Sequence, residues 1–320
     1  MKACVDIGGT KVSVSLVANT HGALPGADNL RAHHAEPTAK TGPPDALALQ
    51  VVRLVQAACA EVGTTLGALQ AVGVASCGPF VMQNGLIALA APNLCGGVAG
   101  PARGLPNNWT SAPLEAPLRA VFGDRLRLEN DGIAALQAER RWGALQGLDH
   151  CGFLTWSTGI GFGLCVDGHV LRGKNGNAGH AGHMFVSDAD DAAALCGCGN
   201  VGDVEGLVAG NAMARRFAPQ GFADAAALLA AAQAGDAQAL TLVDGLCRVM
   251  GRTLYNLAVT LDLQRISIGG SVFWHHQGLL LPRLQAQVQG KLAALTDGFT
   301  LVPAGLGDRV GDFAALALVS

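Results

Sequence analysis

The sequence is poor in charged and aromatic side chains. Only 14% of its 320 residues are Asp, Glu, Lys or Arg, and only 5% are Phe, Trp or Tyr. The formal net charge is −3, so the chain lacks the basic surplus that neutralises a run of phosphates, which argues against a nucleic-acid-binding protein. No apolar run reaches the roughly 18 residues of a membrane-spanning helix. Asp6 would interrupt a signal-peptide core, so we expect a cytoplasmic protein.

The nine cysteines are odd in number and scattered, unlike a disulfide framework. We therefore expect most of them to be reduced core residues. Glycine is abundant, at 44 residues. No Gly-X-Y period accompanies it, which excludes collagen and assigns the glycines to turns and close backbone approaches. Half of the chain is hydrophobic, so a large buried core is expected.

Two strand–turn–strand patterns dominate the chain. In the first, strands at 3–7 and 12–16 flank Gly8-Gly9; in the second, strands at 153–156 and 162–166 flank Gly159, with a hairpin turn after them at Asp167-Gly168. Their similar form indicates two related halves.

Other periodicities predict the remaining elements. Helices are expected at 47–62 with Asp45 as N-cap, at 133–142, at 240–261 and at 308–318, and strands at 71–76, 126–129 and 265–268. Residues 18–44 are rich in turn formers. Residues 92–117 contain five prolines and are predicted to form a long irregular loop.

The segment Asp6-Ile7-Gly8-Gly9-Thr10-Lys11 joins two predicted strands through a glycine turn. Its N–H groups can approach an anion, Thr10 adds a hydroxyl, and Asp6 could hold a metal through water. The alternative is an ordinary hairpin with a buried acid. The chain has no P-loop motif, and a strand follows the spaced glycines at 159–163, so they are not a dinucleotide fingerprint.

Asp131 follows the strand predicted at 126–129. A carboxylate at a strand end can take a hydroxyl proton during phosphoryl transfer. It can equally be a plain helix N-cap, and the residues alone favour the cap.

Taken together, these segments resemble the sugar kinases of the ROK family (repressors, open reading frames, kinases), which belong to the actin-like ATPase superfamily. Six motifs occur in the family's order: Asp6–Lys11, Glu129–Asp131, Ser157–Gly161, Ala178–His183, Cys196–Gly202 and Ile268–Gly270. The resemblance implies a two-lobed α/β actin-like (ribonuclease H-like) fold with a nucleotide and sugar cleft between the lobes. It places an N-terminal lobe at 1–128 with a C-terminal helix at about 306–320, and a C-terminal lobe at 129–305 with a zinc-type loop at 183–205.

The resemblance also implies an activity. The reaction is transfer of the γ-phosphoryl group of ATP, with Mg²⁺, to a hydroxyl of a hexose or N-acetylhexosamine, by analogy the 6-hydroxyl, with Asp131 as general base. The implied sugar-binding residues are Asn93, Asn130, His180, His183 and Glu205. The implied nucleotide-binding residues are Asp6, Gly8, Gly9, Thr10, Lys11, Thr158, Gly159, Gly269 and Gly270. A homodimer is the family expectation, with no nucleic-acid or membrane partner.

The chain departs from the family pattern at three positions. His180 stands where Glu is usual, and a neutral imidazole offers one donor and one acceptor, so a hexose preference does not carry over. Ser157 stands where Gly is usual, and Asp203 replaces a zinc-ligating Cys. Zinc would then be held by His183, Cys196, Cys198 and Asp203. The alternative is that the metal is lost and both cysteines are free thiols.

Two rival functions stay open. A repressor of the same family would carry a DNA-binding segment before the first phosphate motif, and only five residues precede Asp6 here, so we expect none. A catalytically silent sugar-binding or regulatory protein is the second rival. The intact Asp131 and the Gly8-Gly9-Thr10 turn argue against it, whereas His180 and Asp203 keep it open.

Overall fold

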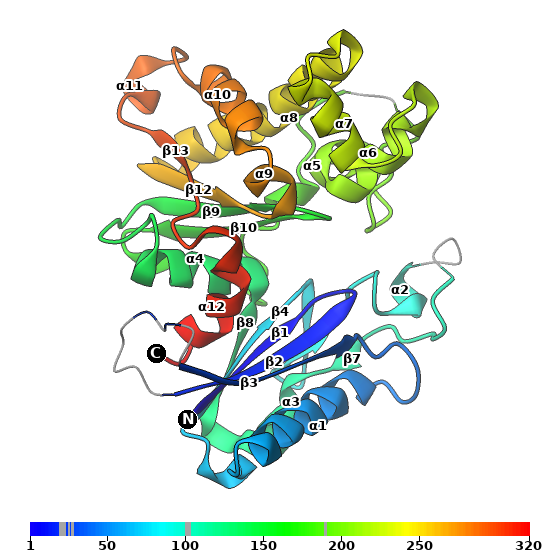
Figure 1. Cartoon of the computed structure of the whole chain (residues 1–320), viewed down its shortest axis with the longest axis vertical. Helices are drawn as coiled ribbons and strands as arrows, with labels where there is room; N and C mark the ends of the chain where they lie inside the picture. The colour runs from blue at the N-terminus through cyan, green and yellow to red at the C-terminus, as the bar shows by residue number, and fades with distance from the viewer. Residues whose placement is uncertain (19–23, 25, 27–28, 100–103, 189–190) are drawn as a thin grey trace. The chain divides into compact units, whose positions relative to one another are not determined.

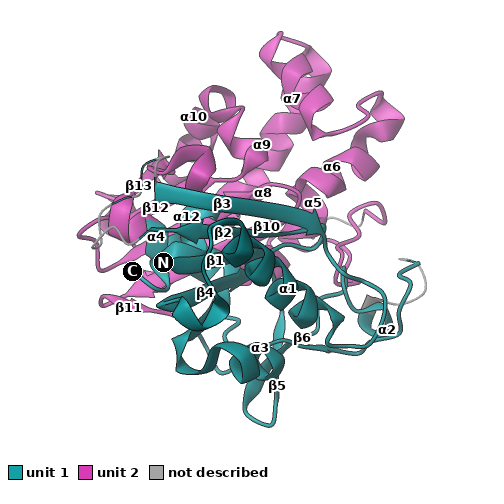
Figure 2. Ribbon diagram, turned by 60° about the horizontal axis from the view of Figure 1, so that its bottom comes forward, with its two compact units in different colours: residues 1–138, 172–178, 311–320 teal, residues 139–171, 179–310 magenta. Residues whose placement is uncertain are grey.

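A computed structural model describes residues 1–18, 24, 26, 29–99, 104–188 and 191–320 of the chain (Figure 1). The chain divides into two compact units, coloured separately in Figure 2. The first unit comprises residues 1–138, 172–178 and 311–320, and the second comprises 139–171 and 179–310. The first unit thus includes residues 129–138 and 172–178, which the sequence-based boundaries assign to the C-terminal lobe.

The first unit is built on a five-stranded sheet in the order β3-β2-β1-β4-β8. Its strands are β1 Lys2–Ile7, β2 Lys11–Val17, β3 Leu30–Pro37, β4 Ala71–Ser76 and β8 Leu126–Asn130. The pairs β1–β2 and β2–β3 are antiparallel, whereas β1–β4 and β4–β8 are parallel. The strands β1 and β4 are buried over nearly their whole length, which suits central strands of a covered sheet.

Further elements complete the first unit. A small sheet contains β5 Phe80–Gln83, β6 Leu86–Leu89 and β7 Ala112–Pro113. The helices are α1 Ala46–Glu61, α2 Gly96–Ala99, α3 Glu115–Phe122, the start of α4 Asp131–Trp142, and α12 Val310–Ala317. The helix α1 buries one apolar face, which includes Val51, Leu54 and Ala58, in the same core cluster as residues of β1, β2 and β4.

The second unit is built on another five-stranded sheet, in the order β11-β10-β9-β12-β13. Its strands are β9 Cys151–Trp156, β10 Ile160–Val166, β11 His169–Val170, β12 Arg265–Gly269 and β13 Thr300–Pro303. Its helices are α5 Val204–Val208, α6 Gly210–Phe217, α7 Ala225–Gln233, α8 Ala237–Leu261, α9 Ser271–Trp274, α10 Gln277–Val288 and α11 Ala293–Thr296. The long helix α8 packs on α5, α7 and α10.

The two sheets have the same topology. In each sheet, two strands form an antiparallel hairpin, β1–β2 or β9–β10. Two parallel strands, β4 and β8 or β12 and β13, then extend the sheet beyond the first strand of that hairpin. This repetition confirms the prediction of two related halves, and the α/β fold class is also as expected. The turn Asp167-Gly168 has positive φ at both residues, as a tight hairpin of the favoured type requires.

The structure differs in detail from four sequence-based expectations. The turn-rich stretch 18–44 contains the strand β3, and the expected loop 92–117 contains α2, β7 and the start of α3. Asp45 occupies the N-cap position of α1, but its side chain makes no capping hydrogen bond. The closing helix is shorter than expected, because a 3-10 turn at Gly307–Arg309 precedes α12.

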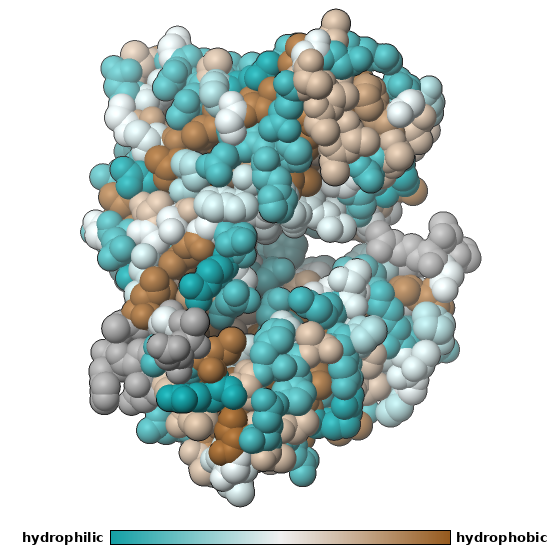
Figure 3. Space-filling view, viewed as in Figure 1, coloured by the Kyte–Doolittle hydropathy of each residue, from teal (hydrophilic) through white to brown (hydrophobic). Residues whose placement is uncertain are grey.

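The surface over α7 is weakly hydrophobic (Figure 3), because Ala226, Ala227 and Ala230 are exposed there. Within the described part of the chain, no single helix has both the length and the hydropathy of a membrane span. The helices α7 and α8 pass that test only as a pair, and they are bent by 115° at the break between them.

Candidate functional site

The parallel strands of the first sheet bring three predicted segments to one edge. The register pairs Ile7 of β1 with Ser76 of β4, and Ser76 with Asn130 of β8. The glycine turn after β1, Cys77 after β4 and Asp131 after β8 therefore lie beside one another. The carboxyl ends of parallel strands are the usual position of ligand sites in open α/β sheets.

The glycine turn between β1 and β2 is held by backbone bonds and by Thr38. The N–H of Gly8 donates to the carbonyl of Lys11 at 2.9 Å. The Thr38 hydroxyl donates to the carbonyl of Gly8 at 2.8 Å, and the Thr38 N–H donates to the carbonyl of Thr10 at 3.1 Å. Thr38 was missed by sequence analysis because it lies in the turn-rich stretch, and it fixes the turn from outside.

Two carboxylates interact at this edge. Burial raises the pKa of Asp6 to about 7, and the neighbouring negative charge of Asp131 adds to the shift. Burial also raises the pKa of the Cys77 thiol, with a further contribution from Asp131 and Asp6. The three side chains thus share one electronegative environment, in which a cation would favour the ionised carboxylates.

Asn130 and Asp131 are fixed where β8 passes into α4. The Oδ1 atoms of Asn130 and Asp131 both accept from the N–H of Gly132, at 3.0 and 2.8 Å. The Asn130 amide also donates to the carbonyl of Ser76 at 3.4 Å. Asp131 is the first residue of α4, and Asn130, one residue earlier, holds the N-cap position and accepts from the N–H two residues on. A carboxylate held in this way is also oriented for general-base chemistry.

The preceding residue, Glu129, is paired as well. Its carboxylate accepts from Nε of Arg172 at 2.6 Å. Asn177 clamps Phe80: its Oδ1 accepts from the Phe80 N–H and its amide donates to the Phe80 carbonyl, each at 2.7 Å. Arg172 and Asn177 thus connect residues 172–178 to the rest of the first unit. Neither residue was identified from the sequence.

Asn93 packs directly on the glycine turn. A Cβ built on Gly9 would overlap Nδ2 of Asn93 and would lie 2.9 Å from its Cγ. The first sheet edge thus collects Asp6, Gly8, Gly9, Asn93, Asn130 and Asp131. Thr10 and Lys11 belong to the same turn and are exposed.

In the second unit, the second phosphate-type turn and the glycine pair after β12 come together. The strands β9 and β12 are parallel, and Gly269 pairs with Thr155. Gly270 has φ +88°, and a Cβ there would lie 2.5 Å from the carbonyl oxygen of Trp156. Only glycine permits this approach, which places Gly269-Gly270 beside the turn that contains Thr158 and Gly159.

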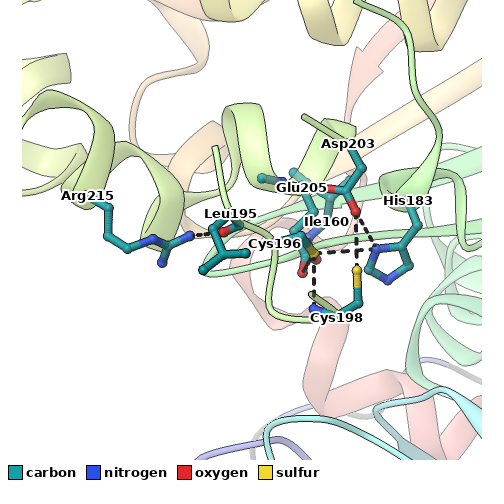
Figure 4. Close-up of polar contacts among 9 residues, drawn as sticks. Ile160, His183, Leu195, Cys196, Cys198, Asp203, Glu205 and Arg215 are labelled. Atoms are coloured by element: carbon teal, nitrogen blue, oxygen red, sulfur yellow. Dashed lines mark hydrogen bonds and ion pairs between the residues drawn. The ribbon is translucent and has the colours of Figure 1, made fainter. Parts of the chain in front are cut away.

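Glu205 on α5 reaches the same turn (Figure 4). Its Oε2 accepts from the N–H of Ile160 at 2.9 Å. A Cβ built on Gly159 would lie 2.9 Å from that Oε2 atom. Glu205 therefore rests on the glycine of the turn, and the Cys196 thiol donates to its other carboxylate oxygen at 3.3 Å.

Four candidate metal ligands converge next to Glu205 (Figure 4). The ligand atoms of His183, Cys196, Cys198 and Asp203 all lie within 4.8 Å of one another. Nδ1 of His183 lies 3.1 Å from Oδ2 of Asp203 and 3.6 Å from Sγ of Cys196, and Sγ of Cys198 lies 3.5 Å from Oδ2 of Asp203. One nitrogen, two sulfurs and one oxygen form a donor set that zinc accepts in tetrahedral geometry.

The electrostatics of these four residues are compatible with a cation. The hydrogen bond that the His183 ring donates to the Asp203 carboxylate raises the pKa of His183. Burial opposes ionisation of Asp203, but hydrogen bonds from His183 and the Gly206 N–H outweigh it and lower the pKa of Asp203. Burial and Glu205 raise the pKa of Cys196, so without a metal its neutral thiol is favoured.

His180 lies beside this group. Its ring centroid is 6.0 Å from that of His183, and the two ring planes are inclined by 27°. His180 immediately precedes the 3-10 turn Ala181–His183. The two implied histidines are therefore neighbours in the second unit. Residues 189 and 190 of the zinc-type loop lie outside the described residues.

Glu139, on α4, is a buried acid that sequence analysis missed. It has no exposed surface. Its Oε2 accepts from the N–H groups of Ala144 and Gly305, each at 2.9 Å, and its Oε1 accepts from the N–H of Leu306 at 2.8 Å. Three backbone donors compensate the buried carboxylate, and the residue ties the end of α4 to the segment after β13.

Comparisons with known proteins agree with this arrangement. A family model described as the ROK family matches residues 2–320. An N-acetylmannosamine kinase of Salmonella paratyphi A is 34% identical over 272 residues, which are 84% of this chain and 82% of that relative. A ROK hexokinase structure from Thermus thermophilus aligns with a TM-score of 0.73 and 31% identity, over 98% of this chain and 96% of its own. A ROK family glucokinase from Streptomyces griseus, solved with glucose and AMPPNP, aligns with a TM-score of 0.67 and 25% identity, over 99% and 97%. The chain described here belongs to the ROK family.

Proposed function

We propose that this protein is an ATP-dependent sugar kinase. It transfers the γ-phosphoryl group of ATP to a hydroxyl of a hexose or N-acetylhexosamine, by analogy the 6-hydroxyl. The observation that carries the proposal is the family match over residues 2–320, which includes every motif quoted above. Relatives named as N-acetylmannosamine kinase and hexokinase support the substrate class.

Asp131 is the proposed general base. In-line transfer needs an acceptor oxygen directed at the γ-phosphorus and a carboxylate that takes its proton. The bond from the Gly132 N–H holds one carboxylate oxygen at the start of α4. The nearby acid Asp6 disfavours a second negative charge at this edge, which favours proton uptake by the pair when no cation is bound.

The sugar hydroxyls would be held by Asn93 and Asn130 of the first unit and by His180, His183 and Glu205 of the second. Amide, imidazole and carboxylate groups are suited to polyols because each hydroxyl both donates and accepts. His183 turns Nδ1 toward Asp203 and Cys196. Its Nε2, on the opposite side of the ring, is the atom we assign to the sugar.

The phosphates of ATP would be held by two glycine turns. The first contains Gly8, Gly9, Thr10 and Lys11, and the second contains Thr158 and Gly159, while Gly269 and Gly270 would face the adenosine. Asp6 is the proposed Mg²⁺ residue, acting through water, and its interaction with Asp131 suits a cation. Bound Mg²⁺ would neutralise phosphate charge during transfer.

We further propose a zinc ion at His183, Cys196, Cys198 and Asp203. The close grouping of the four ligand atoms supports this assignment. Zinc there would have a structural role, because it would fix the imidazole ring of His183 and order the surrounding loop.

An ADP-release assay over a sugar panel tests the proposed activity. The panel would contain glucose, mannose, N-acetylglucosamine and N-acetylmannosamine, each with Mg²⁺ and ATP, and ³¹P and ¹³C spectra would locate the new phosphate. At least one sugar should raise ADP release well above the sugar-free rate, and Asp131→Asn should abolish that increase. Binding of a sugar without ADP release would favour the catalytically silent alternative.

A further inference from the structure

Each unit contains, within itself, a similar contact between a side chain and a glycine turn, which the sheet topology alone does not require. In the first, the side chain of Asn93 covers Gly9; in the second, the carboxylate of Glu205 covers Gly159. Each glycine lies in the turn of an antiparallel hairpin, β1–β2 or β9–β10. Each covering side chain comes from a distant segment and is one that we assign to the sugar.

Both contacts are so short that a Cβ added to either glycine would displace the side chain that covers it. A Cβ at Gly9 would overlap the Asn93 amide nitrogen and lie 2.9 Å from its Cγ, but 3.6 Å from its Cβ, which is ordinary contact. A Cβ at Gly159 would lie 2.9 Å from Oε2 of Glu205. The obstacle in both turns is thus the polar end of a sugar-assigned side chain.

A glycine outside the turn provides the comparison. At Gly67, an exposed position of the first unit, the nearest atom to an added Cβ is the hydroxyl oxygen of Thr65, at 3.9 Å, which is ordinary contact. Gly67 therefore offers a control that touches neither turn.

We infer that Gly9 and Gly159 are positioning residues for the sugar, acting through Asn93 and Glu205. This inference rests on the proposed function. The turns assigned to the phosphates then also form the surfaces on which sugar-binding side chains rest. A shift of either turn moves a sugar contact, so the sugar and nucleotide affinities are coupled, and such coupling is reciprocal.

A double-mutant cycle in the first unit tests the inference. The dissociation constants of glucose and N-acetylmannosamine would be measured by calorimetry without nucleotide, for wild type, Gly9→Ala, Asn93→Ala, the double variant and Gly67→Ala. Gly9→Ala should weaken sugar binding about tenfold, as expected for loss of one good hydrogen bond. The double variant should bind within about twofold of Asn93→Ala alone, because the Cβ at position 9 then meets only a Cβ. Gly67→Ala should bind sugar within about twofold of wild type.

The thermal midpoints of the same variants provide a second readout. If Gly9→Ala is too unstable to assay, the double variant should recover a stable fold, since the obstructing amide is gone. Unchanged sugar affinity in Gly9→Ala, or losses that simply add in the double variant, would overturn the inference. Failure of the proposed function would look different. In that case the wild-type protein, with its turn intact, would bind no sugar and release no ADP.

The second unit supplies an independent arm. Gly159→Ala should weaken sugar binding in the absence of nucleotide, and the loss should not add to that of Glu205→Gln. Sugar affinity equal to wild type in Gly159→Ala would restrict the coupling to the first turn and contradict the inference for the second.

Discussion

The Nδ1 atom of His183 lies 3.1 Å from Oδ2 of Asp203, a carboxylate with no exposed surface. The same carboxylate caps α5 through its other oxygen, which accepts from the Gly206 N–H at 2.7 Å. Asp203 thus contacts the His183 ring with one oxygen and, with the other, caps the helix that carries Glu205. A cysteine at this position has no second atom with which to cap the helix.

We expect protein purified without chelator to contain about one zinc ion per chain. Asp203→Ala should lose the metal and also the helix cap, whose removal typically costs about 1 kcal/mol. Asp203→Asn should weaken metal binding while it keeps an oxygen for the Gly206 N–H. Elemental analysis and thermal unfolding of both variants separate the two tasks. Full metal content in Asp203→Ala would exclude Asp203 as a ligand.

Removal of the Asp131 carboxylate should stop turnover and spare binding. We expect Asp131→Asn to lower kcat by about 10²-fold or more, the usual scale for a general base, with little change in the dissociation constants of sugar and AMPPNP. The amide keeps the shape of the side chain and an oxygen for the Gly132 N–H. Asp45→Asn, at a helix N-terminus without a capping bond, is the control and should keep wild-type kcat.

The stability of the nucleotide-free protein should fall as the pH rises toward neutrality. The pKa of Asp6 is raised to about 7, so the folded protein retains a proton there that the unfolded chain loses near pH 4. The stabilising contribution is therefore complete below about pH 4 and is lost between about pH 4 and 7, at a slope near 1 kcal/mol per pH unit. Asp6→Asn should flatten this part of the profile in Mg²⁺-free urea unfolding. An unaltered slope in that variant would show that Asp6 titrates normally.

Glu139 should be among the most sensitive positions for folding. Glu139→Ala leaves the N–H groups of Ala144, Gly305 and Leu306 buried without their acceptor, and we expect a loss of about 3 kcal/mol or more. The exposed ion pair of Glu61 with His34 gives a matched control, since Glu61→Ala should cost no more than about 1 kcal/mol. Similar unfolding free energies for the two variants would contradict the role assigned to Glu139.

Much of the fold could be predicted because its central strands are buried on both faces. The strand predicted at 71–76 has the bounds of β4, and the helix predicted at 47–62 nearly matches α1. The strand β3 was missed because only Ala32 in it is buried, which leaves no alternation of apolar residues. The helix α3 was missed because Pro117 suggests a loop, although proline is tolerated in the first helical turn.

The site was predictable only where a motif is local. The turn at Gly8–Gly9 and the pair Asn130-Asp131 are contiguous and could be identified from their order along the chain. Glu139 could not, because two of its donors follow it by 166 and 167 residues and nothing in α4 marks it as buried. The contact of Asn93 with Gly9 likewise depends on tertiary packing.

The C-terminal helix α12 sets an order for biosynthesis. It packs on the first sheet so closely that a Cβ on Gly73 of β4 would overlap the carbonyl oxygen of Ala315. The first unit therefore cannot be completed until residues 311–320 have left the ribosome, although its sheet is translated first. The second unit, whose last residue is Val310, has its whole sequence available earlier. A nascent chain stalled before Val310 would therefore leave the face of β4 around Gly73 uncovered.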